Sequence, residues 1–427
     1  MSDLHVKYLI VGGGLAGSEA ARAIREIDRE GDLLVVGQEV NRPYHRPPLS
    51  KQFLRGQQAR EQLFAVSGEW FVENRVLLRT GRRVSHLDTT RSAVVLDNGE
   101  GVSFDRLLIA TGGGAAPLVL PGAQLPNLFY LRTLEDAERL QHAIAKAARE
   151  GHAHPRGRGK AVVIGGGLLG VELAGSLTQS GLHVELSVSS EYPWRRLAGQ
   201  TTGRCITRLL EQHGVVVHAG DPATRLEGDG RVQRVVLASG QTIVCDFAVA
   251  AVGIAIQKDI LRGTPITAEK AILVDAGCRT NIPGIFAAGD CAAVFDPLFS
   301  KHRMMHHWDS AAKTGRIAGA NMAGGDAHFD SASYFDSEIF GMKFQVWGEA
   351  RAVDRRIIRG PAGVESQGFV EIGVATDGRI AQVIAVGITE PKEMLAELVQ
   401  HRVRVSGAEE RLKDPTIPLH DALTGIN

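Results

Sequence analysis

The fold is decided by the stretch Lys7-Tyr8-Leu9-Ile10-Val11-Gly12-Gly13-Gly14-Leu15-Ala16-Gly17, which an alanine-rich segment, residues 18–24, follows. The apolar run is typical of a buried strand, the glycines of a tight turn, and the segment after them of a helix. In the spacing Gly12-x-Gly14-x-x-Gly17, the first glycine permits the turn, the second lets the backbone approach a pyrophosphate, and the third lets helix pack on strand. Phosphates would bind the free N–H groups at the helix start. The stretch therefore predicts a dinucleotide-binding unit.

The same unit recurs later in the chain. Residues 160–164 are another apolar run, and Gly165-x-Gly167-x-x-Gly170 follows them with a second predicted helix. Two such units predict two bound dinucleotides, and a protein usually holds two in order to pass electrons between them. A duplicated unit that has lost its ligand is the alternative.

Size and composition exclude several classes. A chain of 427 residues is long enough for two to three domains, and 50 glycines with 5% aromatic residues suit turn-rich α/β units. The formal net charge is zero, so no basic surface for nucleic acid or polybasic membrane anchor is expected. No apolar run approaches the ~20 residues that span a bilayer. The first strand begins almost at once, which leaves no room for a leader, and we expect a cytoplasmic protein.

Cysteine and histidine spacing gives no sign of a metal or thiol centre. The four cysteines form no C-x-x-C pair, so zinc, iron–sulfur and dithiol chemistry are not expected, and these residues should be buried small hydrophobes. The His/Arg/Gly-rich stretch 151–159 is interpreted as a solvated loop. The stretch 301–308 contains three histidines but lacks acidic or cysteine partners at ligand-like spacing.

The strand that follows each fingerprint helix should end beside a ribose. After the first of these strands, residues 32–37, Glu39 is the candidate ribose ligand, and a plain surface glutamate is the alternative. The corresponding second strand, residues 182–188, is followed by Glu191, Arg195 and Arg196. A carboxylate there favours NADH and an arginine favours NADPH. Glu191 gives a slight preference for NADH, and the choice stays open.

The stretch Arg42-Pro43-Tyr44-His45-Arg46-Pro47-Pro48-Leu49-Ser50-Lys51 comes just after the first unit. Its adjacent prolines impose an extended path, and Ser50 would cap a following helix. Proline-tyrosine followed by R-P-P-L-S-K at this place resembles the FAD-dependent pyridine nucleotide reductases, of the type that serves oxygenase ferredoxins. Rubredoxin reductases and apoptosis-inducing factor belong to the same group.

The resemblance continues in register to the end of the chain. It includes the A-T-G-G turn at residues 110–113, the strand and turn at 248–253, the second FAD signature at 280–290, the tryptophan stretch at 301–308 and the ending at 412–419. Three departures from the family pattern lie where the nicotinamide and the flavin edge are expected. Val188 and His306 each stand where a glutamate is usual, and Asp336 replaces a tryptophan that often lines the flavin.

The resemblance implies an α/β fold with two Rossmann-like dinucleotide-binding domains, as in glutathione-reductase-like proteins, and a C-terminal α+β interface domain. The expected boundaries are 1–115 and 246–326 for the FAD-binding domain, 116–245 for the NAD(P)H-binding domain and 327–427 for the interface domain.

The resemblance also implies which residues form the site. Lys51 and Glu172 would meet beside flavin N5, where the lysine stabilises the reduced flavin and the glutamate holds the lysine; an ordinary ion pair between domains is the alternative. A buried single charge is costly, so the two should occur together. Trp308 would lie near the flavin edge, or else be a plain core residue. The expected cofactor-binding residues are Gly12, Gly14, Gly17, Glu39, Arg46, Lys51, Thr111, Gly112, Gly165, Gly167, Gly170, Glu172, Glu191, Gly253, Gly289, Asp290 and Trp308.

The implied function is an FAD-dependent NAD(P)H oxidoreductase that passes electrons to a separate one-electron carrier, a ferredoxin or rubredoxin, because the chain has no cluster ligands of its own. Two alternatives stay open: an NADH oxidase or quinone reductase, and a redox-sensing interaction protein similar to apoptosis-inducing factor. The protein could be a monomer or a homodimer.

Overall fold

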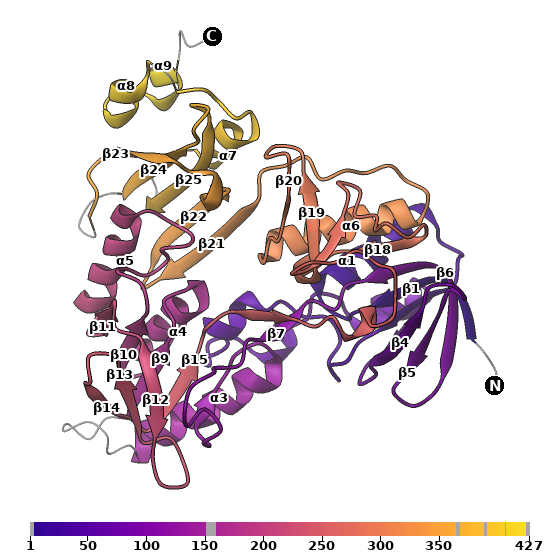
Figure 1. Ribbon diagram of the computed structural model, residues 1–427, viewed down its shortest axis with the longest axis horizontal. Coiled ribbons are helices and arrows are strands. Elements are labelled where there is room, and N and C mark those ends of the chain that lie inside the picture. The colour runs from indigo at the N-terminus through magenta and orange to yellow at the C-terminus, as the bar shows by residue number, and fades with distance from the viewer. Residues whose placement is uncertain (1–3, 151–158, 364–367, 388–390, 406, 424–427) are drawn as a thin grey trace. The chain divides into compact units, whose positions relative to one another are not determined.

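The computed structural model describes residues 4–150, 159–363, 368–387, 391–405 and 407–423 (Figure 1). They form two compact units, each of which combines segments that are distant in the sequence. Unit 1 takes in the described parts of Met1–His45, Arg60–Gly114 and Ala255–Ser333, and unit 2 those of Arg46–Ala59, Ala115–Ile254 and Tyr334–Asn427. The predicted loop 151–159 lies, up to residue 158, outside the described residues.

Unit 1 contains a sheet in the strand order β3-β2-β1-β6-β5-β4, with β18 also paired to β6. In its parallel centre, Ile10 lies between Val35 and Leu108, and all three side chains are fully buried. Strands covered on both faces need apolar residues throughout, which explains the unbroken run before Gly12. The strands are β1 (Leu4–Val11), β2 (Leu33–Val36), β3 (Val76–Arg79), β4 (Val84–Asp88), β5 (Ala93–Leu96), β6 (Gly101–Ile109) and β18 (Ile285–Ala287).

Two helices of unit 1 pack unusually closely, α1 (Leu15–Ile27) and α6 (Trp308–Met322). A Cβ atom at Gly315 would lie 2.3 Å from the carbonyl oxygen of Ala16, and one at Gly319 would lie 2.3 Å from that of Ala20. Since real Cβ atoms do not approach oxygen so closely, only glycine fits at these two positions. The α6 helix is thereby held against the helix that carries the first fingerprint.

Smaller elements complete unit 1. The strands β17, β19 and β20 form a separate three-stranded sheet. These elements are η2 (Arg60–Leu63), α2 (Gly68–Glu73), η3 (Asp259–Leu261), β17 (Ile272–Val274), η4 (Gly289–Cys291), β19 (Ala292–Asp296) and β20 (Lys301–Arg303). Where the chain passes from one unit to the other, β7 (Gly113–Ala115) pairs with β16 (Ile254–Ile256).

Unit 2 contains a parallel sheet in the order β11-β10-β9-β15-β8 and a small sheet β12-β13-β14. Residues 134–150 form the helix α3. The strands are β8 (Leu128–Phe129), β9 (Lys160–Ile164), β10 (His183–Val188), β11 (Val216–Ala219), β12 (Ala223–Glu227), β13 (Arg234–Leu237), β14 (Thr242–Val244) and β15 (Phe247–Ala250). The helices are η1 (Pro47–Ser50), α3 (Leu134–Glu150), α4 (Leu168–Gln179) and α5 (Gln200–Gln212).

The C-terminal part of unit 2 is an antiparallel sheet in the order β21-β22-β25-β24-β23, seen in orange in Figure 1. Phe335 and Phe344 of this sheet make edge contacts with the buried ring of Trp194. The elements are β21 (Tyr334–Ile339), β22 (Met342–Gly348), η5 (Ala350–Ala352), β23 (Arg355–Arg359), β24 (Gly368–Val374), β25 (Ile380–Gly387), α7 (Lys392–Gln400), α8 (Glu409–Lys413) and α9 (Leu419–Leu423).

One local prediction was wrong. Ser50 does not begin a helix but ends the short 3-10 helix η1, because the prolines before it already occupy the first turn. The helix α6 starts at Trp308, since His307 is the last residue with extended backbone. Among the described residues, every helix is too short or too polar to cross a bilayer.

Candidate functional site

The first fingerprint has the geometry that its glycines predict. Gly12 has φ +126°, and a Cβ atom there would lie 2.1 Å from the Ala110 carbonyl oxygen. A Cβ atom at Gly17 would lie 2.0 Å from the carbonyl oxygen of Gly12. Gly14, the residue before α1, has open space around its Cβ position. Two of the glycines are thus required by packing, while the third leaves room for a phosphate at the helix start.

The second fingerprint is built in the same way. Gly165 has φ +122° and would place a Cβ atom 2.4 Å from the carbonyl oxygen of Ala251, and at Gly170 the distance to the Gly165 carbonyl oxygen would be 1.8 Å. Gly167 precedes α4 and again faces open space. Each unit therefore holds one helix N-terminus that an anion can approach.

Four other residues that we expect to bind the first nucleotide lie just after the ends of strands in unit 1. Thr111 and Gly112 follow β6, and Gly289 and Asp290 follow β18. Gly112 and Gly289 adopt positive φ, and the Gly289 N–H donates to Thr314 Oγ1 over 3.0 Å. The ends of parallel strands β1, β6 and β18 meet at one sheet edge, the usual place for a nucleotide in such folds.

Two buried hydroxyls of unit 1 fit a cofactor with many polar atoms. Within the described residues, Thr111 Oγ1 and Ser310 Oγ have no hydrogen-bond partner. A buried polar atom left in this state costs about 1–3 kcal/mol. A polar ligand at this end of the sheet would supply the missing partners.

The remaining predicted ligands are spread over both units. Glu39 of unit 1 is half-buried and accepts a hydrogen bond from the Tyr44 hydroxyl. Arg46 of unit 2 donates to the carbonyl oxygen of Arg132. Gly253 has φ +127° after β15, as a tight turn requires, and Glu191 is exposed beyond β10. Val188 ends β10 with its side chain 1% exposed, so the usual carboxylate position is here buried and apolar.

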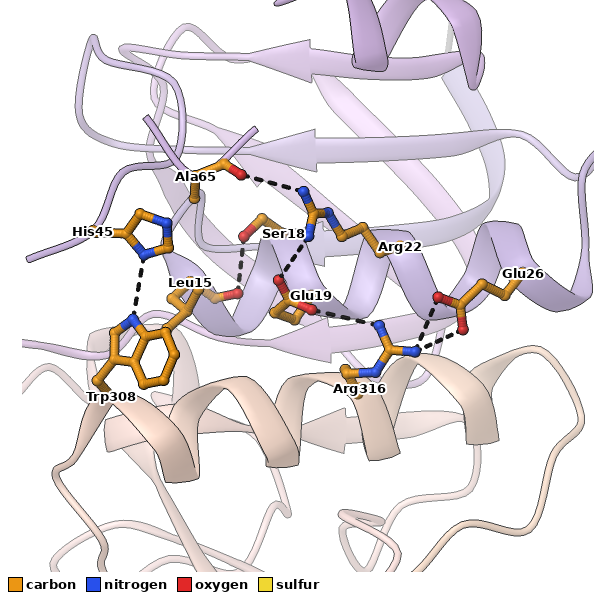
Figure 2. A network of polar contacts seen from close by, with 9 residues as sticks. All are labelled: Leu15, Ser18, Glu19, Arg22, Glu26, His45, Ala65, Trp308 and Arg316. Carbon is orange, nitrogen blue, oxygen red and sulfur yellow. Dashed lines mark hydrogen bonds and ion pairs between the residues drawn. The ribbon is translucent and has the colours of Figure 1, made fainter. Parts of the chain in front are cut away.

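Trp308 is not a core residue, because 49% of it is exposed. It begins α6, and its indole Nε1 donates to Nδ1 of His45 over 3.3 Å (Figure 2). Burial lowers the pKa of His45, an effect that Arg22 reinforces and Glu19 opposes. The imidazole is therefore neutral at pH 7 and able to accept this hydrogen bond. The alternative of a plain core tryptophan is wrong.

A row of charged side chains joins α1 to α6 near this tryptophan (Figure 2). Glu19 lies between Arg22, at 3.3 Å, and Arg316 of α6, at 3.5 Å. Arg316 also contacts Glu26 at 2.7 Å, and this hydrogen bond is the main reason that the pKa of Arg316 is raised. The row fastens the two helices beside the first fingerprint.

Lys51 and Glu172 are brought together in unit 2. The lysine Nζ lies 3.0 Å from Glu172 Oε1, with side chains only 14% and 7% exposed. Glu172 is the fifth residue of α4, and Lys51 directly follows η1. The ammonium group of Lys51, in the loop of residues 46–59, therefore contacts the helix of the second fingerprint, as the resemblance implies.

Two serine hydroxyls complete the site and were missed as functional residues. Ser50 Oγ donates to Glu172 Oε2 over 2.6 Å, and Ser337 Oγ donates to Oε1 over 2.7 Å. In the sequence, Ser50 has the pattern of a helix cap, and Ser337 lies in the Asp336-Ser337-Glu338 triplet, where the departure from the family pattern is at Asp336. Only the fold brings them to one carboxylate.

The loop of residues 46–59 is anchored along its length. Ser176, one helical turn after Glu172, donates to the Ser50 carbonyl oxygen over 2.6 Å and accepts from Arg55 over 3.1 Å. Gln141 of α3 donates to the carbonyl oxygen of Phe53. These bonds explain why the loop belongs to unit 2 although its neighbours in sequence belong to unit 1.

The cysteines are buried and unpaired, as predicted: Cys205, Cys245, Cys278 and Cys291. Burial raises the pKa of Cys205 to about 11 and that of Cys245 to about 12, and it also raises the pKa values of the other two. Their thiols are inert at neutral pH. Among the described residues, no three His, Cys, Asp or Glu side chains are grouped as a metal would require.

Comparisons with known proteins agree with this geometry. A biphenyl dioxygenase system ferredoxin–NAD(+) reductase component from Paraburkholderia xenovorans (strain LB400) is 31% identical over 415 residues, which cover 97% of each chain. Rhodocoxin reductase from Rhodococcus erythropolis is 30% identical over 356 residues, covering 83% of this chain and 81% of its own. A chain of the covalent putidaredoxin reductase–putidaredoxin complex is 26% identical, with a TM-score of 0.90 over 99% of both chains.

Residues 6–315 match the family model described as pyridine nucleotide-disulphide oxidoreductase. Both glycine-rich fingerprints lie within the matched residues. The chain belongs to the pyridine nucleotide-disulphide oxidoreductase family.

Proposed function

We propose that this protein is an FAD-dependent NAD(P)H reductase that passes electrons to a separate iron–sulfur protein. The observation that carries the proposal is the buried Lys51–Glu172 pair. The R-P-P-L-S-K loop supplies the lysine, and the helix of the second fingerprint supplies the glutamate. Likeness over almost the whole chain to relatives named as ferredoxin–NAD(+) reductase components supports the same activity.

The proposal assigns one nucleotide to each fingerprint. FAD would bind the first, in a domain made of residues 1–115 and 246–326, with Gly12, Gly14, Gly17, Glu39, Thr111, Gly112, Gly289 and Asp290. NAD(P)H would bind the second, in residues 116–245, with Gly165, Gly167, Gly170, Glu191 and Gly253, and residues 327–427 would form the interface domain. The open Cβ positions of Gly14 and Gly167 support both assignments.

FAD, when bound, accepts two electrons as a hydride from a nicotinamide and releases them one at a time. The protein then has to orient the two rings and balance charge. Lys51 would supply a positive charge to the reduced flavin, and Glu172 would hold the ammonium in one place. The short distance and the low exposure of the pair support this role over that of a plain ion pair, because a surface pair would gain little.

The nicotinamide preference is proposed as NADH. Several relatives carry NAD(+) in their names, and one from Sphingomonas sp, 28% identical over 99% of both chains, is named as a ferredoxin–NAD(P)(+) reductase. With Val188 buried, the exposed carboxylate of Glu191 is the candidate contact for the ribose hydroxyls.

The acceptor is tested by carrier dependence. The purified yellow protein is mixed with NADH and cytochrome c, with and without an added two-iron ferredoxin or rubredoxin. Fast cytochrome reduction only in the presence of the carrier supports the proposal. Fast turnover with oxygen or a dye alone favours an oxidase or quinone reductase, and sluggish flavin reduction with a long-lived charge-transfer complex favours a redox-sensing protein.

A further inference from the structure

Three separate segments of the chain converge on the carboxylate of Glu172. Lys51 and Ser50 come from the loop of residues 46–59, Glu172 itself from α4, and Ser337 from β21 of the C-terminal sheet. The side chains of Glu172, Ser50 and Ser337 are all buried. A carboxylate only accepts hydrogen bonds, so both hydroxyls donate to it.

We propose that Ser337 is a positioning residue for the Lys51–Glu172 pair, so that the C-terminal sheet helps to set the rate of hydride transfer. The inference rests on the proposed function, in which this pair lies beside the flavin. It gives the C-terminal sheet a part in the reduction of the flavin by the nicotinamide.

The argument starts from the atoms that share Oε1. Lys51 Nζ at 3.0 Å and Ser337 Oγ at 2.7 Å both contact this oxygen, whereas Ser50 contacts Oε2. The last torsion of a glutamate side chain is broad, so contacts alone decide how its carboxylate is turned. Without the Ser337 hydroxyl, Oε1 keeps only the flexible lysine as its partner, and the position of the ammonium group is no longer fixed by a second contact.

A water molecule would not replace the Ser337 hydroxyl as a donor to Glu172. Ser337 is 1% exposed and alternates along β21 with exposed neighbours, so its side chain points into the protein. The lost oxygen was bonded to the Cβ atom, whereas a water molecule would have to stand at van der Waals distance from that atom and so needs more room than the substitution provides. The hydrogen bond would simply be lost, and a bond to a charged group is among the stronger ones in proteins.

The experiment measures anaerobic flavin reduction by stopped flow over a range of NADH concentrations, which separates the limiting rate from the apparent Kd. Ser337→Ala should bind FAD, keep its apparent Kd for NADH within about twofold, and lose about tenfold in limiting rate, as expected for one hydrogen bond to a charged group. Ser337→Thr, which retains the donor, should recover most of the rate.

Ser333→Ala is the matched control. Ser333 is also buried and four residues earlier, but its hydroxyl accepts from Arg303 in unit 1 and does not contact Glu172. Its limiting rate should equal that of the wild type. Should Ser337→Ala not fold, Ser337→Cys keeps the volume with a much weaker donor, and it too should be slow.

The inference is wrong if Ser337→Ala or Ser337→Cys reduces its flavin at the wild-type limiting rate, or if Ser337→Thr is as slow as the alanine variant. A wild-type protein whose flavin is not reduced by NADH or NADPH would instead remove the proposed function, and this inference with it. The two failures are therefore distinguishable in one set of measurements.

Discussion

Lys51 and Glu172, 121 positions apart in the chain, form an ion pair of 3.0 Å in which both side chains are largely buried. The pair joins the R-P-P-L-S-K loop to the fifth residue of the second fingerprint helix. Desolvation makes a buried pair costly unless hydrogen bonds complete it, and here two serine hydroxyls do so. Such an arrangement fits the role that we propose for the pair beside the flavin.

Lys51→Ala should therefore slow flavin reduction roughly 10- to 100-fold while FAD stays bound, because it removes the charge that we propose to stabilise the reduced flavin. Stopped-flow absorbance gives the rate, and the visible spectrum gives the FAD content. Lys413→Ala is the control, since Lys413 pairs with Glu410 on the surface. A Lys51→Ala protein as fast as the wild type would refute the assigned role.

The contacts of Glu371 lead us to expect that this residue stabilises unit 2. Its fully buried carboxylate accepts from the N–H groups of Gly199, at 2.7 Å, and Thr202, at 3.2 Å, at the start of α5, and it pairs with Arg356. Glu371→Ala leaves the helix end without its acceptor and Arg356 without its ion-pair partner, which should cost about 3–5 kcal/mol and lower the Tm by several degrees.

The surface glutamate Glu410, 86% exposed and paired with Lys413, is the matched control for Glu371. Its replacement by alanine should change the free energy of unfolding by less than about 1 kcal/mol. Equal Tm losses in the two variants, measured by scanning calorimetry, would contradict the explanation.

Asp28 predicts a loss of stability in acid. Hydrogen bonds from Lys7, Gly31 and Tyr8 hold the pKa of this carboxyl well below its usual range. Because the folded-state pKa is lower than the unfolded value of about 3.9, the stabilisation is complete above that pH and is lost as the pH falls below it.

Urea unfolding between pH 6 and pH 2.5 measures this effect. The midpoint should fall more steeply for the wild type than for Asp28→Asn, whose side chain does not titrate. Parallel curves for the two proteins would show that Asp28 contributes nothing to the pH dependence.

His45 predicts a pH response of Trp308. The neutral imidazole accepts the indole N–H at pH 7, and the pKa of His45 is lowered by burial, so protonation breaks this contact only below the ordinary histidine range. The difference in fluorescence between wild type and Trp308→Phe should be flat from pH 8 to about 6.5 and change at lower pH. His45→Phe should abolish the change, and its persistence in that variant would assign it to another group.

The sequence predicted the βα units well, because the first and last glycines of each fingerprint are required by local packing. Gly12 and Gly17 would collide with backbone oxygens if they carried a side chain, so the pattern is visible without the fold. The buried cysteines followed in the same way from spacing alone. All four are unpaired and buried in the structure.

Long-range contacts could not be predicted from local pattern. Ser337 reaches Glu172 across 165 positions, and nothing in its own neighbourhood marks it as a partner of that carboxylate. His45 likewise meets Trp308 only because α6 is packed on α1 through Gly315 and Gly319. Propensity also misjudged Ser50, where the two prolines had already started a 3-10 turn.

The central claim is that one nucleotide held by the first fingerprint is reduced by another held by the second. The most direct test is an anaerobic titration of the purified protein with NADH and, separately, NADPH, followed by absorbance near 450 nm. We predict a yellow protein with one FAD per chain that is bleached by one equivalent of NADH, and less readily by NADPH. A colourless protein that does not take up FAD, or a flavin that neither nicotinamide bleaches, would contradict the account.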